Sequence, residues 1–236
     1  MFLPGTSDIT NGARMLDAMG PASPLKNPER VTSAPFGIQR VLDVVLSLGA
    51  LIFFAPLMIG VALAIKVQDG GPIFFGQDRV GFGGRTFKCL KFRSMVVDAE
   101  ARLAAVLADN PELRSYWESH RKLLWDPRVT WLGQMIRKTS VDELPQLINV
   151  LRGDMSLVGP RPIMISERDL YGRWLARYCT MRPGITCLWQ IAGRSHLSFR
   201  QRIALDMLYR RRRSPMTYID ILIRTVPVVL LRRGIV

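Results

Sequence analysis

The feature that most constrains this chain is a run of 22 residues, Val44 to Ile65, without a charged side chain. A helix rises ~1.5 Å per residue and the hydrocarbon core of a bilayer is ~30 Å thick, so the run is long enough to cross a membrane. It is too long, and starts too far from Met1, for the apolar part of a secretory signal, although Ala62-Leu63-Ala64 imitates a cleavage site. We therefore expect a membrane-embedded helix.

Pro56 lies near the centre of this run, where a proline removes a backbone hydrogen bond and clashes with the preceding turn. Basic residues flank both ends, and this favours retention of both ends on the cytoplasmic side. A re-entrant helix, broken at Ala55-Pro56 and returning to the side it entered, satisfies both observations. A kinked helix that spans the bilayer is one alternative, and a buried core helix of a soluble protein is another, which the all-round apolarity disfavours.

The whole sequence predicts a mainly helical α+β fold in three segments. Residues 1–37 are rich in Pro and Gly without apolar periodicity, which is typical of a disordered arm. Residues 38–68 form the membrane helix, and residues 69–236 form a domain on its cytosolic face. Within that domain, two β-rich runs around a glycine-rich turn predict a β-hairpin at about 72–92.

Apolar spacing of three and four predicts a helix after Met95. Further helices are predicted over Ser166–Tyr178 and over Leu197–Arg212. Asp126 and Pro127 match the N-cap and first position of a further helix. The tail after residue 218 mixes apolar residues with arginines, which predicts an interfacial helix among anionic headgroups.

The net charge of the chain indicates an anionic partner. The 33 Lys and Arg residues exceed the 19 Asp and Glu residues, for a net charge of +14. Such a balance indicates nucleic acid, a phospholipid surface or a phosphorylated substrate, and composition does not choose among them. Three cysteines without paired spacing indicate reduced thiols, and two isolated histidines argue against a zinc site.

The stretch SVDELPQLINVLRGDMSLVGPRP, residues 140–162, opens on two adjacent carboxylates, Asp142 and Glu143. Ser140 and Glu143 match a capping box, and Pro145 is tolerated in the first turn of a helix, so one interpretation is a helix cap. The other is chemistry. A helix N-terminus keeps a carboxylate ionised and binds phosphoryl groups, aspartate can attack phosphorus, and paired carboxylates suit magnesium. The local pattern favours the cap, and the two interpretations do not exclude each other.

Cations that suit a diphosphate surround this pair in the sequence: Arg137, Lys138, Arg152 and Arg161. Arg161 stands between Pro160 and Pro162, so its planar fork loses little entropy on binding. The second strand of the predicted hairpin places Lys91 and Arg93 on one face, where solvated charge is the alternative interpretation.

Four motifs resemble those of the bacterial sugar transferases that are monotopic phosphoglycosyl transferases: GPIFFGQDRVG, FKCLKFRSM, DPRVTWLGQMIRKTSVDELPQLINVLRGDMSLVGPRP and RPGITCLWQIAGR. The resemblance covers Phe36 to the C-terminus and is greatest for the short exopolysaccharide-priming members. It implies transfer of a sugar 1-phosphate from a UDP-sugar to undecaprenyl phosphate, with release of UMP. This would be the first membrane step of surface-glycan synthesis, on the cytoplasmic face of the bacterial inner membrane.

The resemblance also implies roles for individual residues. Asp142 matches the nucleophile that forms a covalent phosphosugar intermediate and is the expected ligand of the magnesium ion that the family requires. Glu143 matches the partner that acts as a base or positions the acceptor. The re-entrant helix maps onto Val41–Val67. Lys91, Arg137, Arg161 and Arg194 match basic positions of the family's phosphate and nucleotide site, and Pro160 and Pro162 match its Pro-Arg-Pro element. Together with Arg93, Arg152 and Gln190, they are the expected substrate- and phosphate-binding positions.

The partners implied are the UDP-sugar, undecaprenyl phosphate and inner-membrane lipid, with downstream glycosyltransferases and a second copy of the chain as further expectations and no nucleic acid. Galactose stands slightly ahead of glucose on overall resemblance. A non-catalytic basic module that attaches to the membrane and binds anionic lipid or nucleic acid is the alternative to an enzyme. That alternative accounts for the charge and the apolar run but not for Asp142 and Glu143.

Two positions depart from the family pattern. Many members have Ser-Pro at the helix break, and here it is Ala55-Pro56, so a hydroxyl that would stabilise the bend is missing. Cys187 stands where glycine is expected, near the expected nucleotide pocket. One interpretation is that its larger side chain affects the choice of sugar, and the other is that it has no effect.

Overall fold

The computed structural model describes residues 37–120, 123, 125–192 and 197–230. The predicted arm falls on residues 1–36 almost entirely and so lies outside the described residues, as does Arg194. Contacts divide the chain into two compact units. Of the described residues, the larger unit comprises those within Met1–Phe53, Gly76–Leu90 and Pro145–Val236, and the smaller comprises those within Phe54–Phe75 and Lys91–Leu144.

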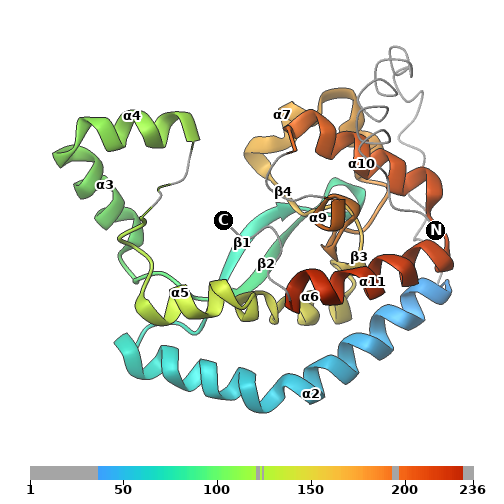
Figure 1. Cartoon of the computed structure of the whole chain (residues 1–236), viewed down its shortest axis with the longest axis horizontal. Coiled ribbons are helices and arrows are strands. Elements are labelled where there is room, and N and C mark those ends of the chain that lie inside the picture. The colour runs from blue at the N-terminus through green and yellow to red at the C-terminus, as the bar shows by residue number, and fades with distance from the viewer. Residues whose placement is uncertain (1–36, 121–122, 124, 193–196, 231–236) are drawn as a thin grey trace. The chain divides into compact units, whose positions relative to one another are not determined.

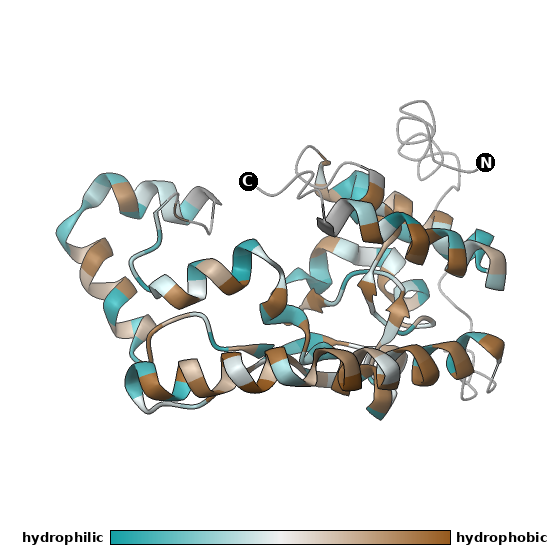
Figure 2. Ribbon diagram, turned by 60° about the horizontal axis from the view of Figure 1, so that its bottom comes forward, coloured by the Kyte–Doolittle hydropathy of each residue, from teal (hydrophilic) through white to brown (hydrophobic). Residues whose placement is uncertain are grey.

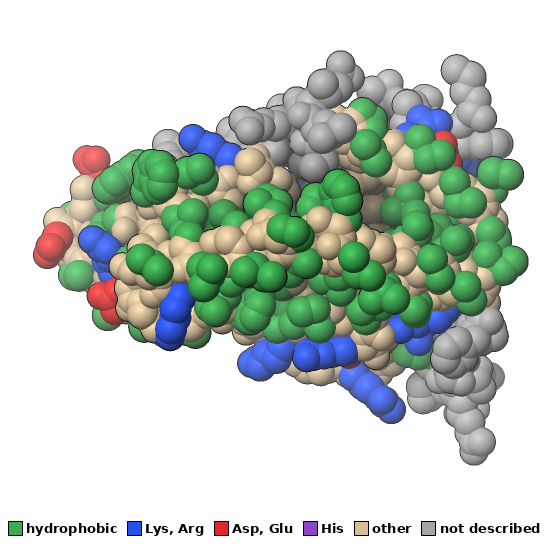
Figure 3. Space-filling model, turned by 90° about the horizontal axis from the view of Figure 1, so that it is seen from below, with side chains coloured by type: hydrophobic (Ala, Val, Ile, Leu, Met, Phe, Trp, Pro, Cys, Tyr) green, Lys and Arg blue, Asp and Glu red, His purple; other side chains and the backbone are tan. Residues whose placement is uncertain are grey.

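The apolar run forms one long helix, α2, from Ile38 to Asp69 (Figure 1). The helix continues through Pro56 without interruption, so the expected break does not end it. Hydrophobic residues colour most of α2 in Figure 2, and Figure 3 shows apolar side chains gathered along its face. Only 11% of its most apolar window is buried, which is the opposite of a soluble core helix. The helix is a candidate membrane segment by length and composition, and its return to the side it entered stays a prediction.

The predicted hairpin is confirmed. Strand β1 runs from Phe74 to Val80 and β2 from Thr86 to Phe92, and with β4 (Ile163–Met164) they form a sheet in the order β2-β1-β4. β1 pairs with β4 antiparallel, with Val80 opposite Ile163. The connecting turn, η1 (Phe82–Gly84), needs a left-handed backbone at Gly83 and Gly84, which explains its glycines.

A second, two-stranded sheet in the larger unit is not predicted by the sequence pattern. β3 (Ser156–Val158) pairs in parallel with β5 (Gly184–Thr186). The backbone segments that contain Gly159 and Gly184 approach so closely that a Cβ atom on Gly184 would lie 2.1 Å from the Gly159 nitrogen. Glycine is therefore required at this crossing.

Helices of the C-terminal half complete the core of the larger unit. Helix α10 (Phe199–Arg212) begins at a capping box made by Ser198 and Gln201, and α11 (Pro215–Leu230) follows it. α9 (Leu188–Ala192) contacts both of them. The fully buried side chains of this core include Tyr178, Leu205, Tyr218 and Ile221.

The single helix predicted over Ser166–Tyr178 is wrong. The segment divides into η3 (Ile165–Glu167), α7 (Arg168–Tyr171), η4 (Gly172–Trp174) and α8 (Leu175–Tyr178). Gly172 has a positive φ of 46°, which interrupts a continuous helix there.

The smaller unit packs around Ile65, Phe92 and Ile136. It contains α3 (Ala99–Asp109), α4 (Pro111–His120) and α5 (Trp131–Lys138). The predicted start of α5 at Pro127 is wrong: Asp126 pairs with Arg128 instead of capping a helix, with a shortest contact of 2.7 Å. Thr130 is the N-cap, because its hydroxyl accepts from Gly133 N at 2.9 Å.

Candidate active site

Asp142 and Glu143 lie on a tight 3-10 turn, η2 (Val141–Glu143), directly after α5. The turn is entered through Ser140, which has a left-handed backbone with φ of 58°. Such a conformation is uncommon outside glycine and is found at functional sites. Asp142 follows two residues later and is buried, with only 7% of the residue exposed.

The predicted helix cap in this stretch is wrong, because no side chain makes a capping hydrogen bond there. Ser140 makes no side-chain cap hydrogen bond, so the capping box is absent. The next helix, α6, runs from Gln146 to Arg152 with Pro145 as its N-cap, and no side chain caps it. Asp142 and Glu143 therefore precede α6 without capping it, and the burial of Asp142 needs another explanation.

Lys91, at the smaller-unit end of β2, lies against both carboxylates. Its Nζ atom donates to Glu143 Oε1 at 2.6 Å and lies 3.9 Å from Asp142 Oδ2. The Lys91 side chain is 29% exposed, so the three groups share a partly desolvated environment in which their charges interact strongly. The predicted phosphate-binding residue Lys91 thus belongs with the predicted catalytic pair.

Arg137, in the last turn of α5, is the second cation of this cluster. Its Nε atom donates to Ser94 Oγ at 2.8 Å, which fixes the direction of the guanidinium. Burial lowers the pKa of Arg137, and the charge of Asp142 acts in the opposite direction. Sequence reasoning missed Ser94 as an orienting residue, although it stands inside the motif FKCLKFRSM.

Burial dominates the ionisation of Asp142. It raises the pKa of this carboxyl to about 6, with Glu143 acting in the same direction and Lys91 and Arg137 opposing it. We expected a helix N-terminus to keep Asp142 ionised. In the structure, the charges that lower the pKa of Asp142 are instead those of Lys91 and Arg137. A buried acid with a raised pKa beside specific cations is typical of a functional site.

Arg93, two residues beyond Lys91, has a different partner. It pairs with Asp69 at the end of α2 and is only 8% exposed. Within the described residues, its Nε and Nη1 atoms have no hydrogen-bond acceptor. In this structure Arg93 connects the end of β2 to the end of α2, and its predicted contact with substrate stays a prediction.

The Pro-Arg-Pro element belongs to the larger unit. Arg161 is exposed, and its guanidinium lies 5.5 Å from the centre of the Trp189 ring. The Tyr178 hydroxyl donates to the Arg161 carbonyl oxygen at 3.0 Å and accepts from Ile163 N at 3.3 Å. Sequence reasoning missed Tyr178, which holds the backbone on both sides of Pro162.

The remaining predicted positions also lie in the larger unit. Arg152 is exposed in the last turn of α6. Gln190 accepts a hydrogen bond from the Cys187 thiol at 3.2 Å. Cys187 is 2% exposed, so the residue that replaces the expected glycine packs inside the core and positions the Gln190 amide.

Known proteins resemble this chain along most of its length. The family model described as "Bacterial sugar transferase" matches residues 34–232. The "Exopolysaccharide production protein ExoY" of Rhizobium meliloti is 42% identical over 224 residues, which cover 89% of this chain and 99% of that protein.

Two further relatives carry names that state a reaction. The "Undecaprenyl-phosphate galactose phosphotransferase" of Salmonella typhimurium is 45% identical over 84% of this chain and 41% of its own length. The "UDP-glucose:undecaprenyl-phosphate glucose-1-phosphate transferase" of Caulobacter vibrioides is 41% identical over 80% of this chain and 68% of its own length. The match thus includes the apolar helix, the hairpin and the Asp142-Glu143 turn.

Proposed function

Because this chain belongs to the bacterial sugar transferase family and is a phosphoglycosyl transferase, we propose that it transfers a hexose 1-phosphate from a UDP-sugar to undecaprenyl phosphate and releases UMP. The relatives named for galactose and for glucose make these two sugars the best candidates. The observation that carries the proposal is the buried Asp142 carboxylate, which caps no helix and lies beside Lys91 and Arg137.

In the first half-reaction, an Asp142 carboxylate oxygen attacks the sugar-bearing phosphorus of the UDP-sugar. A bond forms between that oxygen and phosphorus, and the bond from phosphorus to the bridging oxygen breaks, so that UMP leaves with the electron pair. In the second, a phosphate oxygen of undecaprenyl phosphate attacks the same phosphorus, and Asp142 departs as a carboxylate. Two displacements through a covalent intermediate replace one difficult transfer.

Lys91 and Arg137 support this chemistry through charge. Both lower the pKa of Asp142 and so increase the fraction of the ionised nucleophile. Glu143 is held at 2.6 Å by Lys91, in a position to act as a base for the incoming acceptor phosphate or to position it.

Magnesium fits this site when it is shared with the substrate. The ion binds proteins through one or two carboxylates and completes its ligands with water and substrate phosphates. Asp142 and Glu143 offer that minimum, and the described residues contain no group of three or more potential metal ligands that would hold an ion alone. Asp142 would be the protein ligand, and the ion would neutralise charge on the diphosphate.

The proposed setting is the cytoplasmic face of the inner membrane, at the first membrane step of exopolysaccharide synthesis. It is supported by α2, by the interfacial character predicted for α11 and by relatives named for undecaprenyl phosphate or for exopolysaccharide production. Downstream glycosyltransferases and a second copy of the chain stay expected partners.

The test is UMP release by the purified chain with magnesium, undecaprenyl phosphate and a panel of UDP-hexoses. We expect release with UDP-galactose or UDP-glucose, and its loss in Asp142→Asn and Glu143→Gln. Asp109→Asn, an exposed aspartate at the end of α3, is the matched control and should retain the rate. No UMP with any member of the panel would favour the non-catalytic binding module.

A further inference from the structure

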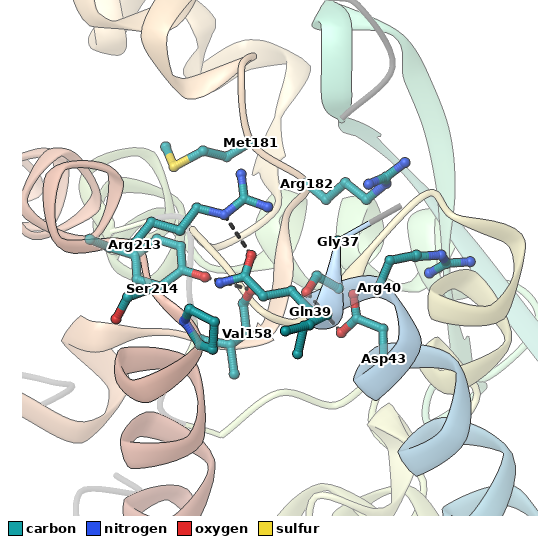
Figure 4. Close-up of a pocket in the computed structure, with 13 residues that line it drawn as sticks. Gly37, Gln39, Arg40, Asp43, Val158, Met181, Arg182, Arg213 and Ser214 are labelled. Carbon is teal, nitrogen blue, oxygen red and sulfur yellow. Dashed lines mark hydrogen bonds between the residues drawn. The ribbon is translucent and has the colours of Figure 1, made fainter. Parts of the chain in front are cut away.

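A basic pocket lies in the larger unit, where α2 begins (Figure 4). Its cavity volume is about 340 Å³, within the range of small-molecule sites. Three arginines line it from three separate parts of the chain: Arg40 from α2, Arg182 from the loop before β5 and Arg213 from the end of α10. The pocket contains none of the residues assigned to the candidate active site.

Each of these arginines is held in place by a neutral acceptor. Arg40 donates to the carbonyl oxygens of Val150 and Leu151 at 2.6 and 2.9 Å. The Arg182 Nε atom donates to the Gly153 carbonyl oxygen at 2.9 Å, and the Arg213 Nε atom donates to Gln39 Oε1 at 2.8 Å. These contacts fix the guanidinium groups without neutralising their charges.

The pocket keeps an excess of positive charge. Asp43 is the one carboxylate among its lining residues, so three arginines and one aspartate leave a net charge of +2. Asp43 is 3% exposed and already accepts from Ser156 Oγ, Leu157 N and the Tyr218 hydroxyl at 2.7 to 2.9 Å. Burial and then the charge of Arg40 lower the pKa of Arg182, with Arg213 adding to the repulsion and Asp43 opposing it.

A structural role explains only part of this arrangement. Arg40 and Arg182 satisfy carbonyl oxygens at the C-terminal end of α6, where the helix dipole is negative. Arg213 takes no part in that cap and nevertheless lines the same cavity. All three arginines line the same cavity, and a guanidinium group binds the oxygens of a phosphate group through its planar set of donors.

We propose that this pocket binds the phosphate of an anionic lipid headgroup and thereby secures the start of α2 at the membrane surface. The position of the pocket favours a lipid over a soluble phosphate. Arg40 and Asp43 stand in the first two turns of α2, and the uncharged run begins at the next residue, Val44. Val41 and Val45, beside them in sequence, are 56% and 59% exposed, so charge and exposed apolar surface adjoin as they do at a membrane interface. The inference does not depend on the identity of the sugar or on the covalent mechanism.

The test is calorimetric titration of the full chain, in a neutral detergent, with short-chain phosphatidylglycerol and separately with inorganic phosphate. We expect phosphatidylglycerol to bind, and Arg182→Gln and Arg213→Gln each to weaken binding by about tenfold, the effect of losing one charge-assisted hydrogen bond. Arg211→Gln, an exposed arginine in the same helix that does not line the cavity, is the matched control and should bind as the unaltered chain does.

Arg213→Lys should recover part of the affinity, because it restores the charge without the planar fork. Circular dichroism of each variant separates lost binding from lost folding, and the exposed Arg213 is the variant best able to fold. Equal affinities for Arg213→Gln and Arg211→Gln would overturn the proposal. Binding of inorganic phosphate but not of phosphatidylglycerol would overturn its assignment to lipid. UMP release, measured in parallel, keeps this outcome separate from the proposed reaction.

Discussion

Lys91 donates its hydrogen bond to Glu143 at 2.6 Å, while Asp142 lies 3.9 Å from the same ammonium group. The two adjacent carboxylates therefore have different environments. Glu143 is fixed by a direct ion pair, whereas Asp142 is buried and influenced by Lys91 and Arg137 through charge. A difference of this kind between neighbouring acids is what allows them to take different roles.

The rate of transfer should rise with pH through about pH 6. Asp142 must be ionised to attack, and burial raises its pKa to about 6. An ordinary aspartate would be ionised above about pH 4. The measurement is single-turnover UMP release from about pH 4.5 to 8. An acid limb near pH 4 would contradict the assignment of Asp142 as the titrating group.

Asp142→Asn should stabilise the protein at pH 7 while abolishing transfer. With a folded-state pKa above the unfolded value, Asp142 holds more protons in the folded state between about pH 4 and 6, so the free energy of unfolding falls as pH rises through that window. Removing this cost should add on the order of 1–3 kcal/mol at pH 7, and the gain should shrink towards pH 4. Thermal unfolding at both pH values measures it. A melting temperature at pH 7 no higher than that of the unaltered chain would refute the prediction.

Lys91→Met should move the acid limb of the pH profile above pH 6. The Lys91 charge lowers the pKa of Asp142, so its removal raises that pKa and leaves less carboxylate at pH 7. Lys88→Met is the matched control, because Lys88 lies on the same strand and pairs at 2.8 Å with Asp78. If both variants gave the same pH profile, Lys91 would have no electrostatic role in catalysis.

Cysteines introduced at Ser33 and Asp69 should both face the cytoplasm. This outcome follows from basic residues on either side of the apolar run and from Pro56 near its centre. A membrane-impermeant maleimide applied to spheroplasts should label neither position until the membrane is permeabilised. Labelling of one position in intact spheroplasts would establish a helix that spans the bilayer.

The elements of the fold that the sequence predicted correctly are those with a clear local pattern, such as the hairpin and α10. The hairpin followed from β-rich runs around Gly83 and Gly84, which the turn needs at positive φ. Helix α10 matches the helix predicted over Leu197–Arg212 and begins at a capping box. Strands β3 and β5 are three residues each, too short for periodicity to reveal, and are held by pairing between distant segments.

In the candidate active site, too, local sequence patterns did not predict contacts between distant residues. The capping box at Ser140 was a valid local pattern, and the left-handed backbone there overrides it. The pairing of Lys91 with Glu143 joins residues 52 positions apart, which no local pattern can predict. Resemblance to a family placed both residues in the site, and the structure shows how they contact each other.

The most direct test of the central claim is the mass of the protein after incubation with magnesium and the UDP-sugar that supports transfer, without undecaprenyl phosphate. The account predicts an added hexosyl phosphate on the peptide that contains Asp142, its absence in Asp142→Asn, and its removal when undecaprenyl phosphate is supplied. An adduct on another residue, or full UMP release by Asp142→Asn, would contradict it.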